Sequence, residues 1–355
     1  MSKLNLSFSE RIGMGIGFIL GFTWVAISVL AVPFQRSKGP VSLKRHLKLI
    51  FFRVFPCYFS PQALVTLSPS TDESYRKVLK EECLEPESIT LDDGTHVHLL
   101  GDDSAEKVLL FFHGGGYVTP AVDAHFKLLV ETIHQVEEHG GRLKIFFLQY
   151  DLAVVSPYPR QLQQASALLK YTLTTLGKQP EQILLAGDSA GGHLALALLS
   201  HILHPHPTVH PIKLDGRFSS VALLSPWVTF DTGKTRSMRL NRYKDALAIP
   251  TLNAWSSTFI GNAPFDPYLQ PLKAPENWFQ GLPVQRVLVL AGGDEIFVDD
   301  IREFGESLRH TFPPTIVEIV KDEAHDHLIL AFLMGEQSSK QQTIFQDWIL
   351  QSVDQ

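Results

Sequence analysis

Short apolar runs alternate with amphipathic stretches along most of the chain. Apolar runs of this length are typical of strands that are buried on both faces of a sheet. We expect strands at 88–91, 96–100, 108–112, 143–150, 182–186, 219–224, 286–291 and 315–320, and helices at 125–138, 161–176, 189–204 and 341–353. The first two strands flank an Asp-Asp-Gly turn and form a hairpin. Right-handed crossovers then predict an α/β fold whose mostly parallel central sheet is flanked by helices.

The N-terminal part of the chain is apolar without the alternation seen later. No charged residue occurs between Ile12 and Phe34, and about 20 apolar residues suffice to cross a bilayer. A secretory signal has a shorter apolar region, about 7–15 residues. We therefore expect an uncleaved transmembrane anchor at about 12–34, within an N-terminal region 1–38. Gly13, Gly17 and Gly21 recur every four residues, a spacing that permits self-association in membranes but also reflects the abundance of glycine in membrane helices.

Two further segments depart from the strand–helix alternation. The region 39–87 begins with a basic amphipathic stretch, which predicts a helix on the bilayer surface, a cap over the active site, or ordinary packing on the core. The region 226–282 lies inside the expected domain 88–355 and is a second candidate cap. Its aromatic residues would line a hydrophobic pocket or pack the cap onto the core; they include Trp227, Phe230, Trp255, Phe259, Tyr268 and Trp278.

Residues 187–191 read Gly-Asp-Ser-Ala-Gly and are the most informative motif. An apolar strand precedes them and a helix-forming run follows, which is the setting of a strained strand–turn–helix that presents a nucleophile. Such a turn requires small residues at Gly187 and Gly191, and it directs a helix N-terminus toward developing negative charge. We therefore predict that Ser189 is a catalytic nucleophile.

A second motif, His-Gly-Gly-Gly at 113–116, follows the strand 108–112. Consecutive glycines allow backbone N–H groups to converge on one point. Acyl transfer needs such donors where a carbonyl oxygen becomes an oxyanion, and each is worth roughly 3–4 kcal/mol of barrier.

Together the two motifs resemble the hormone-sensitive-lipase-like α/β-hydrolases, which include arylacetamide deacetylases and fungal steryl acetyl hydrolases. A Tyr-Asp-Leu-Ala segment at 150–153 also fits, and the resemblance covers about 107–327. It implies that the backbone N–H groups of Gly115, Gly116 and Ala190 form the oxyanion hole, with Gly114 supporting the turn.

A serine nucleophile needs a histidine base that is oriented by a carboxylate, and this fold places them in the order Ser, acid, His. Asp294 follows the strand 286–291 and is the expected acid, although Glu295, Asp299 and Asp300 compete for the role. Asp299 and Asp300 would also suit a helix N-terminus. His325 follows the strand 315–320 and is the expected base, with His327 as the alternative.

Composition narrows the choice of partners. The net charge of −6 argues against nucleic acid, and the proposed chemistry requires neither a cofactor nor a metal. The cluster His201, His204, His206 and His210 alternates with prolines and is predicted to be a surface loop. Cys57 and Cys83 would pair in an oxidising lumen or stay reduced.

These features predict a membrane-anchored serine esterase or deacetylase that acts on lipophilic esters, such as acetylated sterols or secondary metabolites. Amide hydrolysis, acyl transfer on the same triad, and a silent receptor of this fold remain alternatives. Lys3 and Arg11 precede the apolar segment and more basic residues follow it, which predicts a cytosolic catalytic domain. The resemblance instead implies the lumen of the endoplasmic reticulum. The Asn5-Leu6-Ser7 acceptor site does not decide between them.

Overall fold

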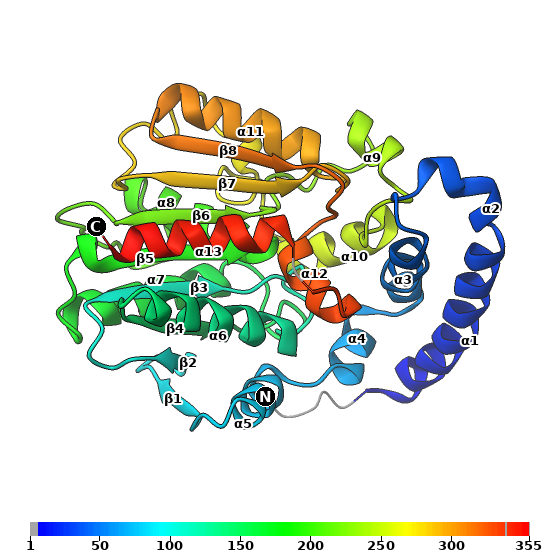
Figure 1. Ribbon diagram of the computed structural model, residues 1–355, viewed down its shortest axis with the longest axis horizontal. Coiled ribbons are helices and arrows are strands. Elements are labelled where there is room, and N and C mark those ends of the chain that lie inside the picture. The colour runs from blue at the N-terminus through cyan, green and yellow to red at the C-terminus, as the bar shows by residue number, and fades with distance from the viewer. Residues whose placement is uncertain (1–5, 338, 355) are drawn as a thin grey trace.

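The computed structural model describes residues 6–337 and 339–354 (Figure 1). An eight-stranded sheet forms the centre, in the order β1-β2-β4-β3-β5-β6-β7-β8. Its strands are β1 (Glu87–Thr90), β2 (His96–Gly101), β3 (Lys107–Phe112), β4 (Leu143–Gln149), β5 (Ile183–Asp188), β6 (Ser220–Leu224), β7 (Val287–Gly292) and β8 (Thr315–Val320). All eight strands predicted from the apolar runs are present, displaced by at most a few residues.

The strand directions follow the predicted pattern. β1 and β2 form an antiparallel hairpin, and β2 pairs antiparallel with β4. The pairs from β4 through β3, β5, β6 and β7 to β8 are parallel. Every residue of β4, β5, β6 and β7 is buried, which explains why these strands read as continuous apolar runs. The carboxyl ends of the parallel strands therefore share one edge, where functional groups collect.

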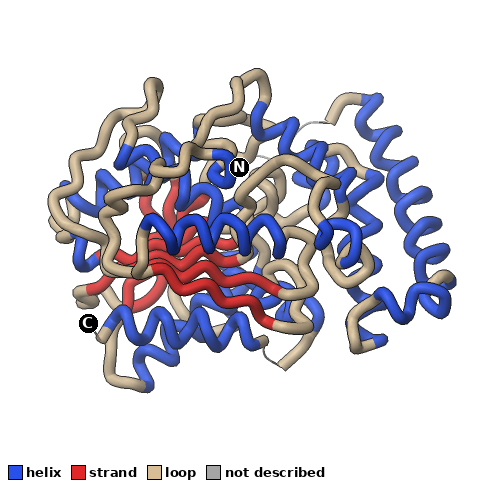
Figure 2. Tube along the Cα trace, turned by 90° about the horizontal axis from the view of Figure 1, so that it is seen from above, coloured by secondary structure: helices blue, strands red, loops and turns tan. Residues whose placement is uncertain are grey.

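Helices cover both faces of the sheet, as Figure 2 shows. α6 (Asp123–Glu138) and α13 (Lys340–Val353) contribute to the core on one face. α7 (Arg160–Thr174), α8 (Ala190–Leu203) and α11 (Val298–Thr311) contribute to the core on the other. α11 was not among the predicted helices, nor was α12 (His327–Met334), which contacts α6 and α13.

Between β6 and β7, the predicted insertion contains three short elements. They are α9 (Arg236–Leu240), α10 (Ile249–Ile260) and the 3-10 helix η4 (Pro271–Lys273). Five of its nine aromatic residues are at most 7 % exposed: Trp227, Phe230, Phe259, Tyr268 and Phe279. Most of these rings therefore pack the insertion onto the core.

The N-terminal region consists of helices beside the insertion (Figure 1). They are α1 (Phe8–Leu30), α2 (Val32–Gln35), η1 (Arg36–Lys38), α3 (Leu43–Val54), η2 (Phe55–Tyr58), α4 (Pro61–Leu67) and α5 (Thr71–Glu81). Within residues 6–337 and 339–354, α1 alone is long and apolar enough to cross a membrane. Lys3 and Asn5 lie outside the described residues.

The glycines of α1 do not form a free face for self-association, which corrects the prediction. Gly17 and Gly21 are buried. A Cβ atom at Gly17 would approach the Tyr58 carbonyl oxygen to 2.5 Å, and one at Gly21 would contact the Phe55 ring. Gly13 has no other atom within 4 Å of its Cβ position. The small residues therefore admit η2 of the same chain rather than a second helix.

Candidate active site

Ser189 lies in the sharp turn between β5 and α8, as the motif predicts. Its backbone has φ 50° and ψ −112°, a left-handed conformation that is strained for a residue with a side chain. A Cβ atom at Gly187 would collide with the backbone of Gly191, and one at Gly191 would collide with the carbonyl of Phe112. The flanking glycines are therefore required by backbone contacts, and the turn is held rigidly against the end of β3.

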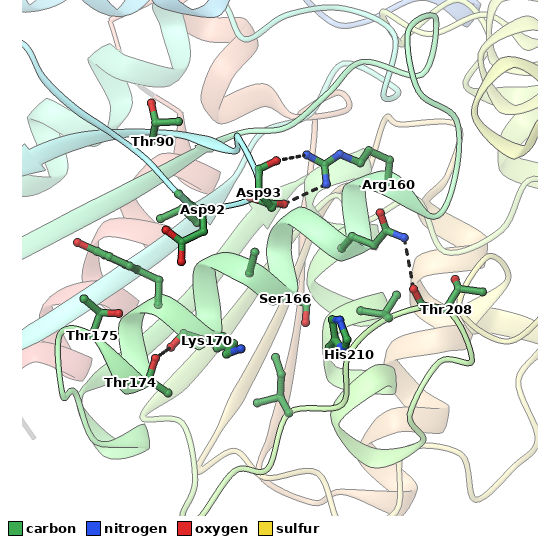
Figure 3. Close-up of a pocket in the computed structure, with 16 residues that line it drawn as sticks. Thr90, Asp92, Asp93, Arg160, Ser166, Lys170, Thr174, Thr175, Thr208 and His210 are labelled. Atoms are coloured by element: carbon green, nitrogen blue, oxygen red, sulfur yellow. Dashed lines mark hydrogen bonds and ion pairs between the residues drawn. The ribbon is translucent and has the colours of Figure 1, made fainter.

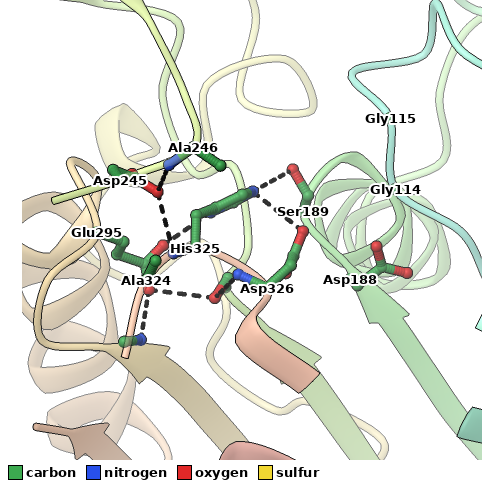
Figure 4. Close-up of polar contacts among 12 residues, drawn as sticks. Gly114, Gly115, Asp188, Ser189, Asp245, Ala246, Glu295, Ala324, His325 and Asp326 are labelled. Carbon is green, nitrogen blue, oxygen red and sulfur yellow. Dashed lines mark hydrogen bonds and ion pairs between the residues drawn. The ribbon is translucent and has the colours of Figure 1, made fainter. Parts of the chain in front are cut away.

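The loop after β8 brings His325 to Ser189 (Figure 4). His325 Nε2 lies 2.9 Å from Ser189 Oγ, which is hydrogen-bonding distance. Both side chains are only 6 % exposed. A neutral imidazole in this position can take the hydroxyl proton as Oγ attacks a carbonyl carbon.

The structure places Glu295, and not Asp294, against the histidine. Glu295 Oε2 lies 2.8 Å from His325 Nδ1, and Glu295 Oε1 accepts hydrogen bonds from Gly292 N and Ser225 Oγ. Asp294 instead pairs with Lys244 at 2.7 Å. The expectation for Asp294 is corrected because the turn after β7 directs it toward Lys244, while the longer Glu295 side chain reaches back under the imidazole.

The other acid and base candidates have different neighbours. Asp299 accepts a hydrogen bond from Ser237 N, and both Asp299 and Asp300 lie in the first turn of α11, as the helix-terminus interpretation predicts. His327 Nε2 contacts Glu336 at 3.1 Å. These residues stabilise local structure, and none of their hydrogen bonds reaches Ser189.

Asp245, which no sequence motif indicates, joins the loops that carry Glu295 and His325. Its carboxylate is fully buried and accepts N–H groups from Ala246, Ile296 and His325 at 2.6, 2.7 and 3.1 Å. Burial raises the pKa of Asp245 to about 6. The buried Arg53 of α3 donates to the Asp245 carbonyl at 3.0 Å, so the N-terminal region is tied to the same junction.

A second carboxylate faces the catalytic nitrogen. Asp326 Oδ2 lies 3.0 Å from His325 Nε2, while Asp326 Oδ1 is buried and has no hydrogen-bond partner among the described residues. Burial raises the pKa of Asp326 to about 7, against the attraction of His325. Burial alone would lower the pKa of His325, but Asp326 and then Glu295 outweigh it and raise that pKa well above 6.5. The two carboxylates therefore favour the protonated form of His325.

The glycine loop after β3 lies against the serine turn. Gly115 and Gly116 have φ 95° and 60°, and a Cβ atom at Gly114 would collide with Asp188. In the part of the chain that the structure describes, the N–H groups of Gly115 and Gly116 donate to no other residue. Ala190 begins α8, where backbone N–H groups have no intrahelical partner. These donors fit the oxyanion hole that the motifs predict.

Buried aromatic residues fix this loop. Tyr150 stacks on His113 with ring centroids 4.2 Å apart and donates to the His113 carbonyl at 2.7 Å. Burial lowers the pKa of His113 to about 3, so the ring is neutral. Trp255 of α10 lies so close to Gly116 that a Cβ atom there would enter the indole ring. Trp255 thus forms a wall beside the oxyanion donors.

The histidine cluster and the cysteines have no contact with the site. His201 Nε2 contacts the His210 carbonyl at 2.9 Å, and its Nδ1 accepts from His206 N. Cys57 and Cys83 are both free thiols. Among the described residues, no group of three or more His, Cys, Asp or Glu side chains is arranged to hold a metal ion.

A large cavity lies away from the serine site. It measures about 680 Å³ and is lined by α7, by the β1–β2 turn and by the loop at 208–212, as Figure 3 shows. Arg160 on its rim pairs with Asp93 at 3.0 Å and Asp151 at 2.9 Å. None of its lining residues belongs to the serine site, so we assign it no catalytic function.

Comparisons with known proteins agree with the fold. A family profile described as alpha/beta hydrolase fold matches residues 109–329. The chain is 30% identical to an esterase of Acinetobacter venetianus over 206 residues, which cover 57% of this chain and 61% of the relative. It is 26% identical to steryl acetyl hydrolase 1 of Saccharomyces cerevisiae over 209 residues, 55% of this chain and 46% of that protein. The match thus spans only about half to three fifths of these two relatives.

A solved structure supports the fold over a longer stretch. An esterase from the bacterial hormone-sensitive lipase family superposes with a TM-score of 0.64 at 22% identity, covering 88% of this chain and 99% of that one. At this identity the likeness establishes the fold alone. The family profile covers more than half of the chain and shows that the chain belongs to the α/β-hydrolases, and its motifs resemble those of the hormone-sensitive-lipase-like branch.

Proposed function

We propose that the protein is a membrane-anchored serine carboxylesterase that removes short acyl groups, acetyl above all, from lipophilic alcohols such as sterols or secondary metabolites. The observation that carries this proposal is the continuous chain of contacts from Ser189 Oγ through His325 to Glu295. A receptor that had lost catalysis would not need this chain, so the geometry favours an enzyme.

The proposed reaction passes through an acyl-enzyme. Ser189 Oγ attacks the ester carbonyl while His325 Nε2 takes its proton, and Glu295 holds the imidazole by Nδ1. The N–H groups of Gly115, Gly116 and Ala190 stabilise the oxyanion. His325 then returns the proton to the leaving alcohol, and a water molecule, activated by the same base, releases the acid.

Two observations support a small acyl group on a lipophilic alcohol. Trp255 fills the space beside Gly116, which limits the room on that side of the oxyanion donors. The apolar helix α1 packs on the segment that also contacts Trp255, which brings a membrane-seeking element close to the site. One similar protein is named a steryl acetyl hydrolase. The family resemblance further suggests a lumenal domain in the endoplasmic reticulum.

The test uses the full-length protein in detergent with p-nitrophenyl esters from acetyl to decanoyl. We expect acetyl and butyryl esters to be cleaved at least about tenfold faster than octanoyl esters, and Ser189→Ala to lose at least about 10³-fold in kcat. Acyl transfer to an added alcohol would favour a transferase instead. Failure of folded protein both to turn over any ester and to bind a fluorophosphonate at Ser189 would contradict the proposal.

A further inference from the structure

The central part of α1 is packed on η2 of the same chain. Gly17 rests on Tyr58 and Phe59, and Gly21 rests on Phe55. The Phe18 ring lies 5.1 Å from Phe59 in edge-to-face contact. These contacts lie near the middle of the helix Phe8–Leu30, the level that would coincide with the bilayer midplane if α1 crossed the membrane.

This packing conflicts with a simple crossing. Phe59 belongs to one apolar cluster with Trp255, and Trp255 lies against the glycine loop. A perpendicular α1 with these contacts would bring the neighbourhood of the active site to the centre of the hydrocarbon. The second helix after η2, α5, exposes the charged side chains of Arg76 and Lys77. Charged side chains are costly near the bilayer centre. A helix that lies in the membrane surface, with lipid on one side and protein on the other, avoids this conflict.

The neighbouring helix α3 exposes apolar side chains, although it also buries Leu49 in the core. Leu43, Leu47 and Phe51, spaced four residues apart, are 49%, 39% and 42% exposed. Of its basic residues, Lys44 is exposed, whereas Arg45 pairs with Glu336 at 2.7 Å and Arg53 is buried. Water disfavours the three exposed apolar side chains, since apolar burial is worth about 25 cal/mol per Å². A hydrocarbon environment outside α3 explains the orientation.

The exposed faces of α1 and α3 are connected. Phe22 of α1 and Phe51 of α3 are 56% and 42% exposed, and both rings contact Phe55, with centroids 5.1 and 4.9 Å away. The outer face of α1 continues this surface with Ile12, Ile16, Ile19, Ile27 and Leu30, all 44% exposed or more. An isolated interfacial helix needs a polar face of its own, but η2, α3 and α4 cover the corresponding side of α1.

We propose that α1 lies in the plane of one membrane leaflet, docked on η2 of the same chain, and that α1 and α3 together form a single surface that contacts lipid. The proposal rests on the membrane anchoring put forward under the proposed function, but the anchor is a helix in the membrane plane and not a transmembrane helix. Both ends of α1 then lie on the same side of the membrane. The basic residues that follow α1 then need not mark the cytosolic side of a crossing helix, because two of them, Arg45 and Arg53, make hydrogen bonds within the protein.

The first test places a glycosylation acceptor in an N-terminal extension or, separately, in a C-terminal extension of the full-length chain, made with microsomes. If α1 lies in the membrane plane, both extensions should be glycosylated or neither should be, and protease should cleave both or neither. Modification of only one extension would show a crossing helix and overturn the proposal, while leaving esterase activity, measured on the same preparations, as an independent result.

A second test concerns α3. In full-length protein lacking both cysteines (Cys57→Ser, Cys83→Ser), Phe51→Cys should react at least about tenfold more slowly with a water-soluble maleimide in membranes than in detergent-free unfolding buffer. Ile316→Cys is the control, because Ile316 is 48% exposed on β8, far from α1. Equal rates for the two positions in membranes would place α3 in water and refute the shared lipid surface.

The third test asks whether the docking matters for catalysis. Gly17→Leu should lower kcat/KM for p-nitrophenyl acetate about tenfold, because it forces η2 away from α1 and disturbs Trp255 beside the donors. Gly13→Leu is the matched control, since its Cβ position meets no other atom within 4 Å. A free tether predicts that neither change matters. Equal losses would indicate self-association through the glycine stripe and contradict the docked arrangement.

Discussion

At the scale of single residues, two adjacent carboxylates after β7 have different neighbours. Glu295→Gln should reduce kcat about 10³–10⁴-fold, because the amide cannot hold the imidazole in the required tautomer. Asp294→Asn should stay within about threefold of the parent, since it loses only a partly exposed contact with Lys244. Steady-state hydrolysis of p-nitrophenyl acetate measures both. The reverse ranking would restore Asp294 as the acid.

Asp326 should set the pH at which the base becomes available. Its carboxylate favours the imidazolium form, so His325 keeps its proton until the pH rises past a raised pKa. We expect the midpoint of the acidic limb of kcat/KM to lie above 6.5, the ordinary pKa of histidine, and Asp326→Asn to lower that midpoint by about one unit. Glu295, Asp245 and Asp188 remain nearby in both proteins. An unchanged midpoint, measured in buffers of constant ionic strength, would show that Asp326 has no influence on the base.

At the scale of elements, α3 supports the loop that carries the base. Leu49 is fully buried in a cluster with Ala324, Leu330 and Met334, and Ala324 directly precedes His325. Leu49→Ala should cost about 2–5 kcal/mol of stability by leaving a cavity. Thermal unfolding in detergent, with Leu47→Ala on the exposed face as control, measures the difference. Equal shifts in Tm would mean that α3 is not part of the folded core.

Sequence patterns predicted the sheet because each central strand is buried on both faces and therefore reads as one apolar run. They also predicted Ser189, His325 and the glycine loop, whose backbone geometry restricts the residue types. They could not choose between Asp294 and Glu295, because the choice depends on the direction of a turn. No sequence motif indicated Asp245, because its carboxylate accepts hydrogen bonds from backbone N–H groups of distant loops.

At the scale of the whole molecule, the N-terminal region was the least predictable. Its apolar residues and basic residues suit a surface helix equally well with either face outward, and only tertiary contacts show that Arg45 and Arg53 turn inward. The glycines of α1 likewise satisfy a self-association pattern, yet their partner is η2. A local pattern indicates that a face is used, but the identity of its partner depends on the rest of the fold.

Removal of residues 1–38 is the test at this scale. Deleting a helix that only anchors the protein should not change the stability of the rest of the chain. Deleting a docked α1 would instead uncover Phe55 and Phe59, each at a cost of about 1.5–3 kcal/mol when exposed to water. We therefore expect the truncated protein to aggregate without detergent and, in detergent, to show a lower Tm and at least about fivefold lower kcat/KM on p-nitrophenyl acetate. The full-length chain in the same detergent is the control. A monodisperse truncated enzyme with unchanged Tm and kcat/KM would show that α1 only tethers, because no contact between α1 and η2 could then contribute to the folded state.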